Sequence, residues 1–272
     1  MILQIKDDFD IEKIVNSGQC FRPRMLSDGS FLFVTGREFL KIKEVGHNSF
    51  GVSVDLDTWK RIWFDYFDMG SEYCHVRESV SKDDEFMQTC ARESQGIRIL
   101  RQNKWEMLIS YIISQRKSIP AIRTAVEKLC VLYGDKIGDV DGEVIYSFPE
   151  PEQMMNATKK ELDSCGLGYR TEYILNAIDY VNKNKTEWDS IESLGDEELF
   201  DYLKKFKGVG DKVANCVMLF AYHRISRAPV DTWIKKVMDE KYGGENPFIE
   251  YGENAGIIQQ YVFHYVQNKK GL

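Results

Sequence analysis

The sequence predicts an α+β fold, in which an N-terminal antiparallel β-sheet domain is followed by a mainly α-helical region. Two observations support this prediction. Before residue 57, short runs rich in β-branched and aromatic residues alternate with tight turns. After residue 57, apolar residues recur at the spacing of helices. Strand signals therefore precede helix signals instead of alternating with them, as they would in an α/β protein.

Strand signals occupy the first 56 residues. A short apolar opening at 2–5 is followed by runs at 31–35, 38–43 and 49–54. Turn-forming residues rich in glycine separate the last three runs. We expect these runs to pair as an antiparallel meander.

Helical periodicity starts near residue 57, where Asp57 or Thr58 is the expected N-cap. Asn103 and Glu106 have the residue types of a capping box at the start of a strongly apolar helix. Helices are expected at 75–93, 104–113, 119–133, 159–165, 171–183, 196–206 and 255–267. By secondary structure, we divide the chain into domains at 1–95 and 96–272.

The composition argues against several classes of protein. Six cysteines stand far apart without a CxxC pair, so neither a zinc site nor an iron–sulfur cluster is expected. A net charge of −7 argues against a generally basic nucleic-acid binder, although a local site needs only a few cations and backbone amides. No signal peptide is evident, and no stretch nears the roughly 20 apolar residues that cross a bilayer. We expect a soluble, intracellular protein with no membrane partner.

The stretch from Leu203 to Val237 contains the residues with the clearest chemical potential. Its glycine hairpin, Lys207-Gly208-Val209-Gly210, joins two predicted helices within about 196–224. The two glycines allow positive φ and a close approach to the backbone. Because the first N–H groups of the next helix are unpaired, the corner suits a DNA backbone phosphate. It equally suits an ordinary helical corner with a solvated lysine face.

Two residues in this stretch are candidates for catalysis. Lys212 lies in the first turn of the second helix, where the helix dipole and partial burial disfavour its ammonium form. A neutral amine is what a Schiff-base nucleophile requires, although a lone lysine here would be read as a surface residue. Asp231 lies in the 225–233 segment and is expected to cap a third helix. Its carboxylate would also stabilise a developing positive charge.

The helix–GVGDKVA–helix pattern followed by PVD resembles the helix-hairpin-helix Gly/Pro-Asp (HhH-GPD) superfamily of base-excision DNA glycosylases. Within it, the sequence is similar to the 8-oxoguanine DNA glycosylases over most of its length. Further motifs that support the resemblance are Ser17-Gly18-Gln19-Cys20-Phe21-Arg22, Ile99-Leu100-Arg101-Gln102, Gly166-Leu167-Gly168-Tyr169-Arg170 and the helix from Gly256 to Phe263. The resemblance implies an α-helical HhH-GPD glycosylase core.

The resemblance also implies a bifunctional DNA N-glycosylase with AP lyase activity. Its partner would be double-stranded DNA containing 8-oxoguanine, bound by a monomer in a bacterial nucleoid or a eukaryotic nucleus. Lys212 would attack C1′ of the flipped-out nucleotide while Asp231 stabilises the positive charge, and β-elimination would then cut the strand. No cofactor is required for this route, although a monovalent cation can sit on the hairpin carbonyls.

Four residues are implied in base recognition. The Gly18 carbonyl would accept the N7–H, a donor that 8-oxoguanine has and guanine lacks. Phe263 and Cys216 would pack on the two faces of the base, and the Gln259 amide would read its Watson–Crick edge. Each residue also has an ordinary interpretation, as a turn glycine, a core side chain or a solvated glutamine.

The remaining implied contacts are with DNA around the lesion. Gln115, Arg116 and Tyr169 occupy the positions that wedge the duplex, and Arg170 the position that contacts the orphaned cytosine. The sequence departs from the better-known members at four places. Arg116-Lys117-Ser118 stand where those members have three asparagines, and Ala121 stands where they have a second cytosine-reading arginine. Trp233 replaces a histidine near the 5′ phosphate, and Val266 replaces the carboxylate partner of that histidine. We therefore expect a weaker dependence on the opposite base.

Two other functions fit parts of the sequence. A related glycosylase for alkylated or other oxidised purines would share the hairpin and Lys212, and the implied base pocket argues against it. A non-catalytic DNA-binding module would keep the hairpin alone. The presence of both Lys212 and Asp231 argues against that second alternative.

Overall fold

The computed structural model describes residues 1–186 and 188–269. Contacts group the chain into two compact units. The first, here called the sheet unit, comprises Met1–Leu32, Leu40–Arg101 and His223–Leu272. The second, the hairpin unit, comprises Phe33–Phe39 and Gln102–Tyr222. The division into domains at 1–95 and 96–272, which was based on secondary structure, stays a prediction. By contact, residues 223–272 belong to the same unit as the N-terminal residues.

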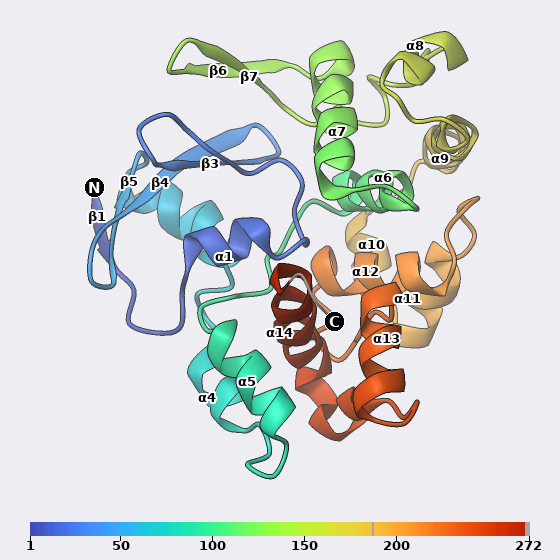
Figure 1. Ribbon diagram of the computed structural model, residues 1–272. Coiled ribbons are helices and arrows are strands. Elements are labelled where there is room, and N and C mark those ends of the chain that lie inside the picture. The colour runs from blue at the N-terminus through green and yellow to red at the C-terminus, as the bar shows by residue number, and fades with distance from the viewer. Residues whose placement is uncertain (187, 270–272) are drawn as a thin grey trace. The chain divides into compact units, whose positions relative to one another are not determined.

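The predicted N-terminal antiparallel sheet is confirmed and has five strands in the order β1-β5-β4-β3-β2 (Figure 1). The strands are β1 (Ile2–Gln4), β2 (Arg24–Met25), β3 (Phe31–Thr35), β4 (Glu38–Gly46) and β5 (Ser49–Val52). The opening strand β1 pairs antiparallel with β5, with Leu3 opposite Phe50. The two-residue strand β2, which the sequence did not indicate, pairs with the start of β3.

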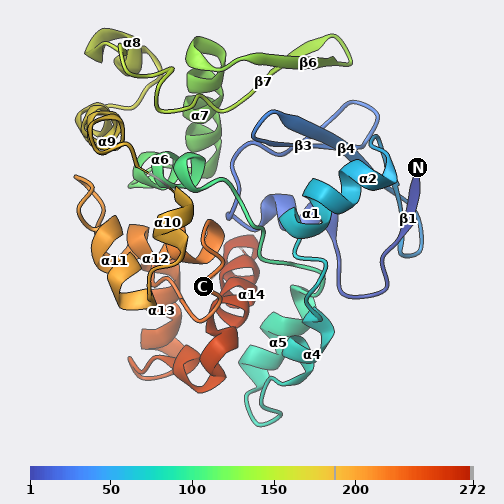
Figure 2. The ribbon, with the colours of Figure 1, turned by 180° about the vertical axis from the view of Figure 1, so that it is seen from behind.

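The described residues of the sheet unit also form nine helical segments. They are α1 (Ile11–Asn16), α2 (Leu56–Thr58), the π-helical η1 (Trp59–Trp63), α3 (Phe64–Tyr66), α4 (Tyr73–Glu78), α5 (Glu85–Glu93), α13 (Thr232–Lys241), the 3-10 helix η2 (Pro247–Asn254) and α14 (Ala255–Asn268). The buried helix α14 packs against α5 on one side and α13 on the other (Figures 1 and 2). It therefore forms the centre of the C-terminal part of this unit.

The helix expected from residue 57 differs from the prediction at its start and in its interior. Its N-cap is Asp55, whose carboxylate accepts a hydrogen bond from the Thr58 N–H at 2.7 Å, so the expected caps Asp57 and Thr58 are wrong. A π-helical segment then widens the helix between Trp59 and Trp63, both of which are buried. The apolar spacing predicted the buried face, and the bulky indoles on that face accompany the wider turn.

The hairpin unit is mainly helical, as predicted. Its elements are α6 (Lys104–Ser114), α7 (Ile119–Tyr133), β6 (Lys136–Val140), β7 (Glu143–Tyr146), α8 (Lys159–Ser164), α9 (Arg170–Asn184), α10 (Trp188–Glu192), α11 (Asp196–Leu203) and α12 (Asp211–Phe220). The buried α6 packs against α7, α9 and α12. The β6–β7 hairpin was missed, although its turn, Asp141-Gly142 with φ of 55° and 84°, is a strong hairpin signal.

A buried carboxylate, Asp68, links segments of the sheet unit that are far apart in sequence. Its Oδ1 lies 2.9 Å from Nη2 of Arg101 and its Oδ2 lies 3.2 Å from Nε2 of His223. The Tyr73 hydroxyl donates a third bond to it. Burial raises the pKa of Asp68, but His223 and Arg101 outweigh that effect and lower it to about 2.

Replacing Asp68 with asparagine is expected to lower the free energy of unfolding by roughly 1.5–3 kcal/mol at pH 7, because it weakens the buried hydrogen bond from Tyr73 and removes the ion pair with Arg101. The folded-state pKa lies below the ordinary 3.8, so this stabilisation is complete above about pH 4 and is lost as pH falls towards 2. Denaturant unfolding at pH 7 and pH 3 measures both effects. Asp65→Asn is the control, because Asp65 is exposed although it also lies near Arg101. An equal loss in both variants would contradict the prediction.

Candidate DNA-binding and catalytic site

The glycine hairpin connects α11 to α12 in the hairpin unit, as the sequence predicted. Gly208 has a φ of 86°, and a Cβ at this position would overlap the ring of Tyr173 on α9. Val209 is buried beneath the turn. Tyr173, which the sequence did not single out, thus fixes the hairpin conformation that only glycine allows.

The N-terminus of α12 carries no side-chain cap, since its N-cap residue is Gly210. Asn103 and Asp231, in contrast, cap α6 and α13 with their side chains. The first N–H groups of α12 and the positive end of its dipole therefore have no side-chain acceptor, which is the arrangement that binds a phosphate. Lys204 forms an ion pair with Asp211 at 2.7 Å on the same turn.

Lys212 is half-buried in the first turn of α12. Its Nζ lies 5.2 Å from the centre of the Tyr111 ring on α6, and that ring stacks on Phe220 at 5.7 Å. Cys216 lies one turn further along α12 and is buried, on the same helical face as expected. The aromatic support from Tyr111 was not predicted, because it comes from a different helix. The Tyr111 ring therefore lies against the end of the lysine side chain.

The wedge residues of the hairpin unit come together in two adjacent loops. The guanidinium of Arg170 donates to the carbonyl oxygens of Gln115 and Leu167, and it stacks 4.3 Å from the ring centre of Tyr169. Tyr169 itself is half exposed, whereas Arg170 is buried. Arg170 therefore braces the two loops, and its contact with an orphaned cytosine stays a prediction.

The loop after α6 adds two unusual cations. Arg116 has a φ of 51°, which is uncommon for a residue other than glycine. The Nζ of Lys117 donates to the Gly166 carbonyl at 2.5 Å. Partial burial and the nearby Arg170 lower the pKa of Lys117. These positive groups lie where the sequence placed the contacts with duplex DNA, so the loop suits an anionic partner.

In the sheet unit, the structure brings Gly18 and Phe263 into contact. Gly18 has a φ of 77°, and a Cβ there would lie 2.7 Å from Cε1 of Phe263. The Gln260 amide donates to the Ser17 carbonyl, which holds the loop on α14. Gln259 lies one turn before Phe263 and is 3% exposed. Two ends of the chain thus supply three of the four predicted base-recognition residues to one place.

Asp231 caps α13, as predicted, by accepting a hydrogen bond from the Ile234 N–H at 2.8 Å. This hydrogen bond fixes the Asp231 carboxylate at the start of α13. Trp233, in the first turn of α13, leaves 42% of its surface exposed, and Val230 leaves 37%. An exposed indole beside the candidate catalytic aspartate provides a surface on which a nucleotide can pack.

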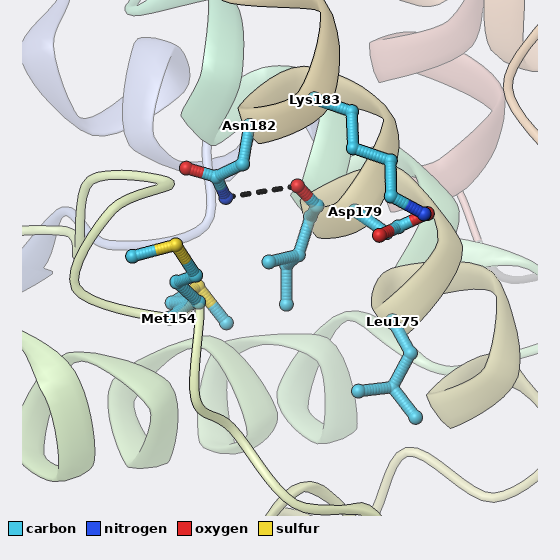
Figure 3. Close-up of a pocket in the computed structure, with 7 residues that line it drawn as sticks. Met154, Leu175, Asp179, Asn182 and Lys183 are labelled. Atoms are coloured by element: carbon cyan, nitrogen blue, oxygen red, sulfur yellow. Dashed lines mark hydrogen bonds and ion pairs between the residues drawn. The ribbon is translucent and has the colours of Figure 1, made fainter.

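A cavity of about 410 Å³ in the hairpin unit contains none of the predicted site residues (Figure 3). It lies between the turn at Met154 and Met155 and one face of α9. The Asn182 amide donates to the Ile178 carbonyl, and Asp179 pairs with Lys183 at 2.8 Å. Because these polar groups already have partners within the protein, we assign no function to this cavity.

Two protein families match consecutive parts of the chain. Residues 1–108 match the family described as 8-oxoguanine DNA glycosylase, N-terminal domain. Residues 109–247 match the family described as HhH-GPD superfamily base excision DNA repair protein. The chain belongs to the HhH-GPD superfamily. Within this superfamily, the first match places it among the 8-oxoguanine DNA glycosylases, as its sequence motifs predicted.

Known HhH-GPD proteins resemble the chain in sequence and structure. It is 34% identical over 159 residues to the N-glycosylase/DNA lyase of Saccharomyces cerevisiae, a match that covers 54% of this chain and 42% of the yeast protein. MBOgg1, in complex with a low affinity DNA ligand, gives a TM-score of 0.92 at 32% identity and covers 99% of this chain and 96% of that one. The Clostridium acetobutylicum 8-oxoguanine glycosylase/lyase, in complex with dsDNA containing cytosine opposite to 8-oxoG, gives a TM-score of 0.89 at 29% identity. This match covers 100% of this chain and 99% of that one.

Three further observations describe this HhH-GPD chain. Within residues 1–186 and 188–269, no three His, Cys, Asp or Glu side chains gather in a way that would hold a metal ion. No helix in the described part of the chain is both long and apolar enough to cross a membrane. All six cysteines are free thiols, and five of them are buried.

Proposed function

We propose that this chain is a bifunctional DNA glycosylase/AP lyase that excises 8-oxoguanine from duplex DNA and then cleaves the strand. The observation that carries the proposal is the packing of the Gly18 loop against Phe263, since Gly18 lies in the part of the chain that matches the N-terminal domain of 8-oxoguanine glycosylases. This packing puts the backbone of Gly18 beside an aromatic ring on which a purine would stack. The hairpin and Lys212 supply the phosphate contact and the nucleophile.

Lys212 is the proposed nucleophile. Its Nζ bonds to C1′ of the extruded nucleotide as the bond from C1′ to the base breaks, and the base leaves with a proton. The Asp231 carboxylate stabilises the positive charge on the sugar and the amine. The C1′–O4′ bond of the sugar then breaks as the nitrogen lone pair forms the C1′=N bond, and O4′ takes up a proton. The resulting protonated imine acidifies C2′, so that loss of a proton there releases the 3′ phosphate by β-elimination.

Discrimination against guanine rests on the imidazole edge of the base. Guanine has an acceptor at N7, whereas 8-oxoguanine has an N7–H donor. The Gly18 carbonyl would pair with that donor and would face an acceptor if guanine entered. A backbone carbonyl cannot turn away from the mismatch as a side chain can, so the selection is built into the fixed loop.

Incision assays on labelled duplexes test the proposed function. Wild-type protein is expected to cut a duplex that carries 8-oxoguanine and to leave a matched duplex with guanine intact. A third duplex with an alkylated purine tests the related glycosylase activity. Preference for the alkylated purine, or DNA binding without incision of any duplex, would contradict the proposal.

We also expect weak dependence on the base opposite the lesion. Arg170 is buried and bonded to two backbone carbonyls, and Ala121 stands where better-known members have a second cytosine-reading arginine. Losing half of a donor pair removes roughly 1–3 kcal/mol of discrimination. Single-turnover excision of 8-oxoguanine opposite C, A, G and T is therefore expected to vary by less than a hundredfold. A preference for C of a hundredfold or more would show that another residue reads the cytosine.

A further inference from the structure

Helix α14 places a second glutamine beside the Gly18 loop. Gln259, Phe263 and Gln267 follow one another at intervals of four residues and therefore share one face of the helix. The Oε1 atom of Gln267 lies 3.7 Å from the position that a Cβ would take on Gly18. All of these residues belong to the sheet unit.

The amide oxygens of Gln259 and Gln267 are both buried and, among the residues that the structure describes, have no hydrogen-bond partner. A buried polar atom without a partner costs free energy, because it gives up water without gaining a bond. Neighbouring buried amides are satisfied: Gln260 donates to the Ser17 carbonyl, and Gln19 bonds with Ser17 and Arg98. The two unpaired amides are thus confined to the face of α14 that carries Phe263.

The spacing of the two amides suits a purine. Eight residues of helix separate Gln259 from Gln267, or about 12 Å along the axis, with Phe263 midway between them. A purine stacked on the Phe263 ring would therefore have one glutamine towards each of its two edges. The Watson–Crick edge would face one glutamine, and the imidazole edge, with C8, would face the other.

We propose that Gln267 is a specificity-determining residue whose amide, turned about the last side-chain bond so that its N–H and not its oxygen faces the base, donates to O8 of 8-oxoguanine. This inference rests on the proposed function and extends it from N7 to the oxidised carbon itself. The imidazole edge of 8-oxoguanine presents an N7–H donor next to a C8=O acceptor. The Gly18 carbonyl and the Gln267 amide form the complementary acceptor and donor. Guanine carries only a C8–H at that position, so it leaves the amide unpaired.

Equilibrium binding to non-cleavable duplexes tests the proposal without any chemical step. The duplexes carry 2′-fluoro-8-oxoguanosine, 2′-fluoroguanosine or a tetrahydrofuran abasic analogue. Gln267→Leu, which keeps the bulk of the side chain but has no donor, is expected to bind the 8-oxoguanine duplex about tenfold more weakly than wild type. Gln267→Glu, which keeps an acceptor but not the donor, should show at least the same loss. Binding to the other two duplexes should stay within about twofold.

Asn268→Leu is the matched control. Asn268 is the next residue, is exposed, and donates its amide back to the His264 carbonyl, so its replacement should leave all three affinities unchanged. Cleavage of a preformed abasic site provides a second check, because it needs Lys212 but no base. Gln267→Leu should retain this cleavage, which a misfolded protein would lose.

The outcomes separate this inference from the proposed function. If Gln267→Leu binds the 8-oxoguanine duplex as tightly as wild type, or weakens all three duplexes equally, Gln267 does not read O8. If wild type prefers the 8-oxoguanine duplex but cuts no DNA, the catalytic proposal fails while the binding comparison still decides the role of Gln267. If wild type shows no preference for 8-oxoguanine, both ideas fail.

Discussion

Lys212→Gln is expected to abolish both base excision and strand cleavage, with a loss of roughly 10⁴-fold or more in the single-turnover rate. Glutamine removes the nucleophile, and no covalent route remains. Affinity for the 8-oxoguanine duplex should change by less than about threefold, because phosphate contacts come from backbone amides and other cations. Labelled-duplex assays for rate and binding measure both quantities.

Folding should survive this substitution. Lys212 is half-buried over the Tyr111 ring, and a glutamine chain covers much of the same surface with similar helix propensity. Lys183→Gln is the control, because Lys183 is an exposed lysine on α9 that forms an ion pair with Asp179 at 2.8 Å. It should cut DNA at the wild-type rate. If Lys212→Gln retains a tenth or more of the wild-type rate, Lys212 is not the nucleophile.

Asp231→Asn is expected to reduce excision by about 10²–10³-fold while leaving stability nearly unchanged. Asparagine caps a helix as well as aspartate does, so it can accept the bond from the Ile234 N–H that Asp231 accepts now. It carries no negative charge, however, and cannot stabilise the cationic transition state. Single-turnover kinetics and denaturant unfolding on the same preparation test the two halves of this prediction.

Asp231→Ala separates the two roles of the aspartate. It removes the cap as well as the charge, so the free energy of unfolding should fall by about 0.5–2 kcal/mol in addition to the kinetic loss. If the asparagine variant were fully active and only the alanine variant impaired, Asp231 would be a structural cap and nothing more.

Local sequence signals predicted most of the fold. The strand-forming runs at 31–35 and 38–43 became β3 and β4, and the capped apolar helix after Asn103 became α6. These elements form where the buried face and the local propensity agree. The spacing of apolar residues predicts the buried face, and the residue types predict the propensity. The short helix α10 was missed because its five residues are too few for a periodic pattern.

Contacts between distant segments were not predictable in the same way. Asp68 binds Arg101 and His223 across long stretches of chain, and nothing near any of the three residues indicates the pairing. The return of α13 and α14 to the unit of the N-terminal sheet is likewise a matter of tertiary packing. Contacts of this kind depend on which helices and strands pack against one another, and a single sequence does not show that packing.

The candidate site was predicted in part by chemistry and in part by resemblance. Lys212 and the hairpin glycines could be selected from the residues alone, whereas Gly18 and Phe263 came from the resemblance. The structure then brought Gly18 and Phe263 into contact. Tyr173 and Tyr111 were missed because each supports the site from another helix. Gln267 had a signal, its spacing of four from Phe263, which acquires meaning once the Gly18 loop is seen beside it.

Borohydride trapping tests the central claim most directly, because it detects the proposed imine between protein and DNA. Wild-type protein mixed with a duplex that carries 8-oxoguanine and with sodium borohydride is expected to form a stable covalent adduct. Lys212→Gln is expected to form none, and a guanine duplex should give none with either protein. An adduct of equal yield with Lys212→Gln, or no adduct with wild type while the base is still released, would contradict covalent catalysis by Lys212.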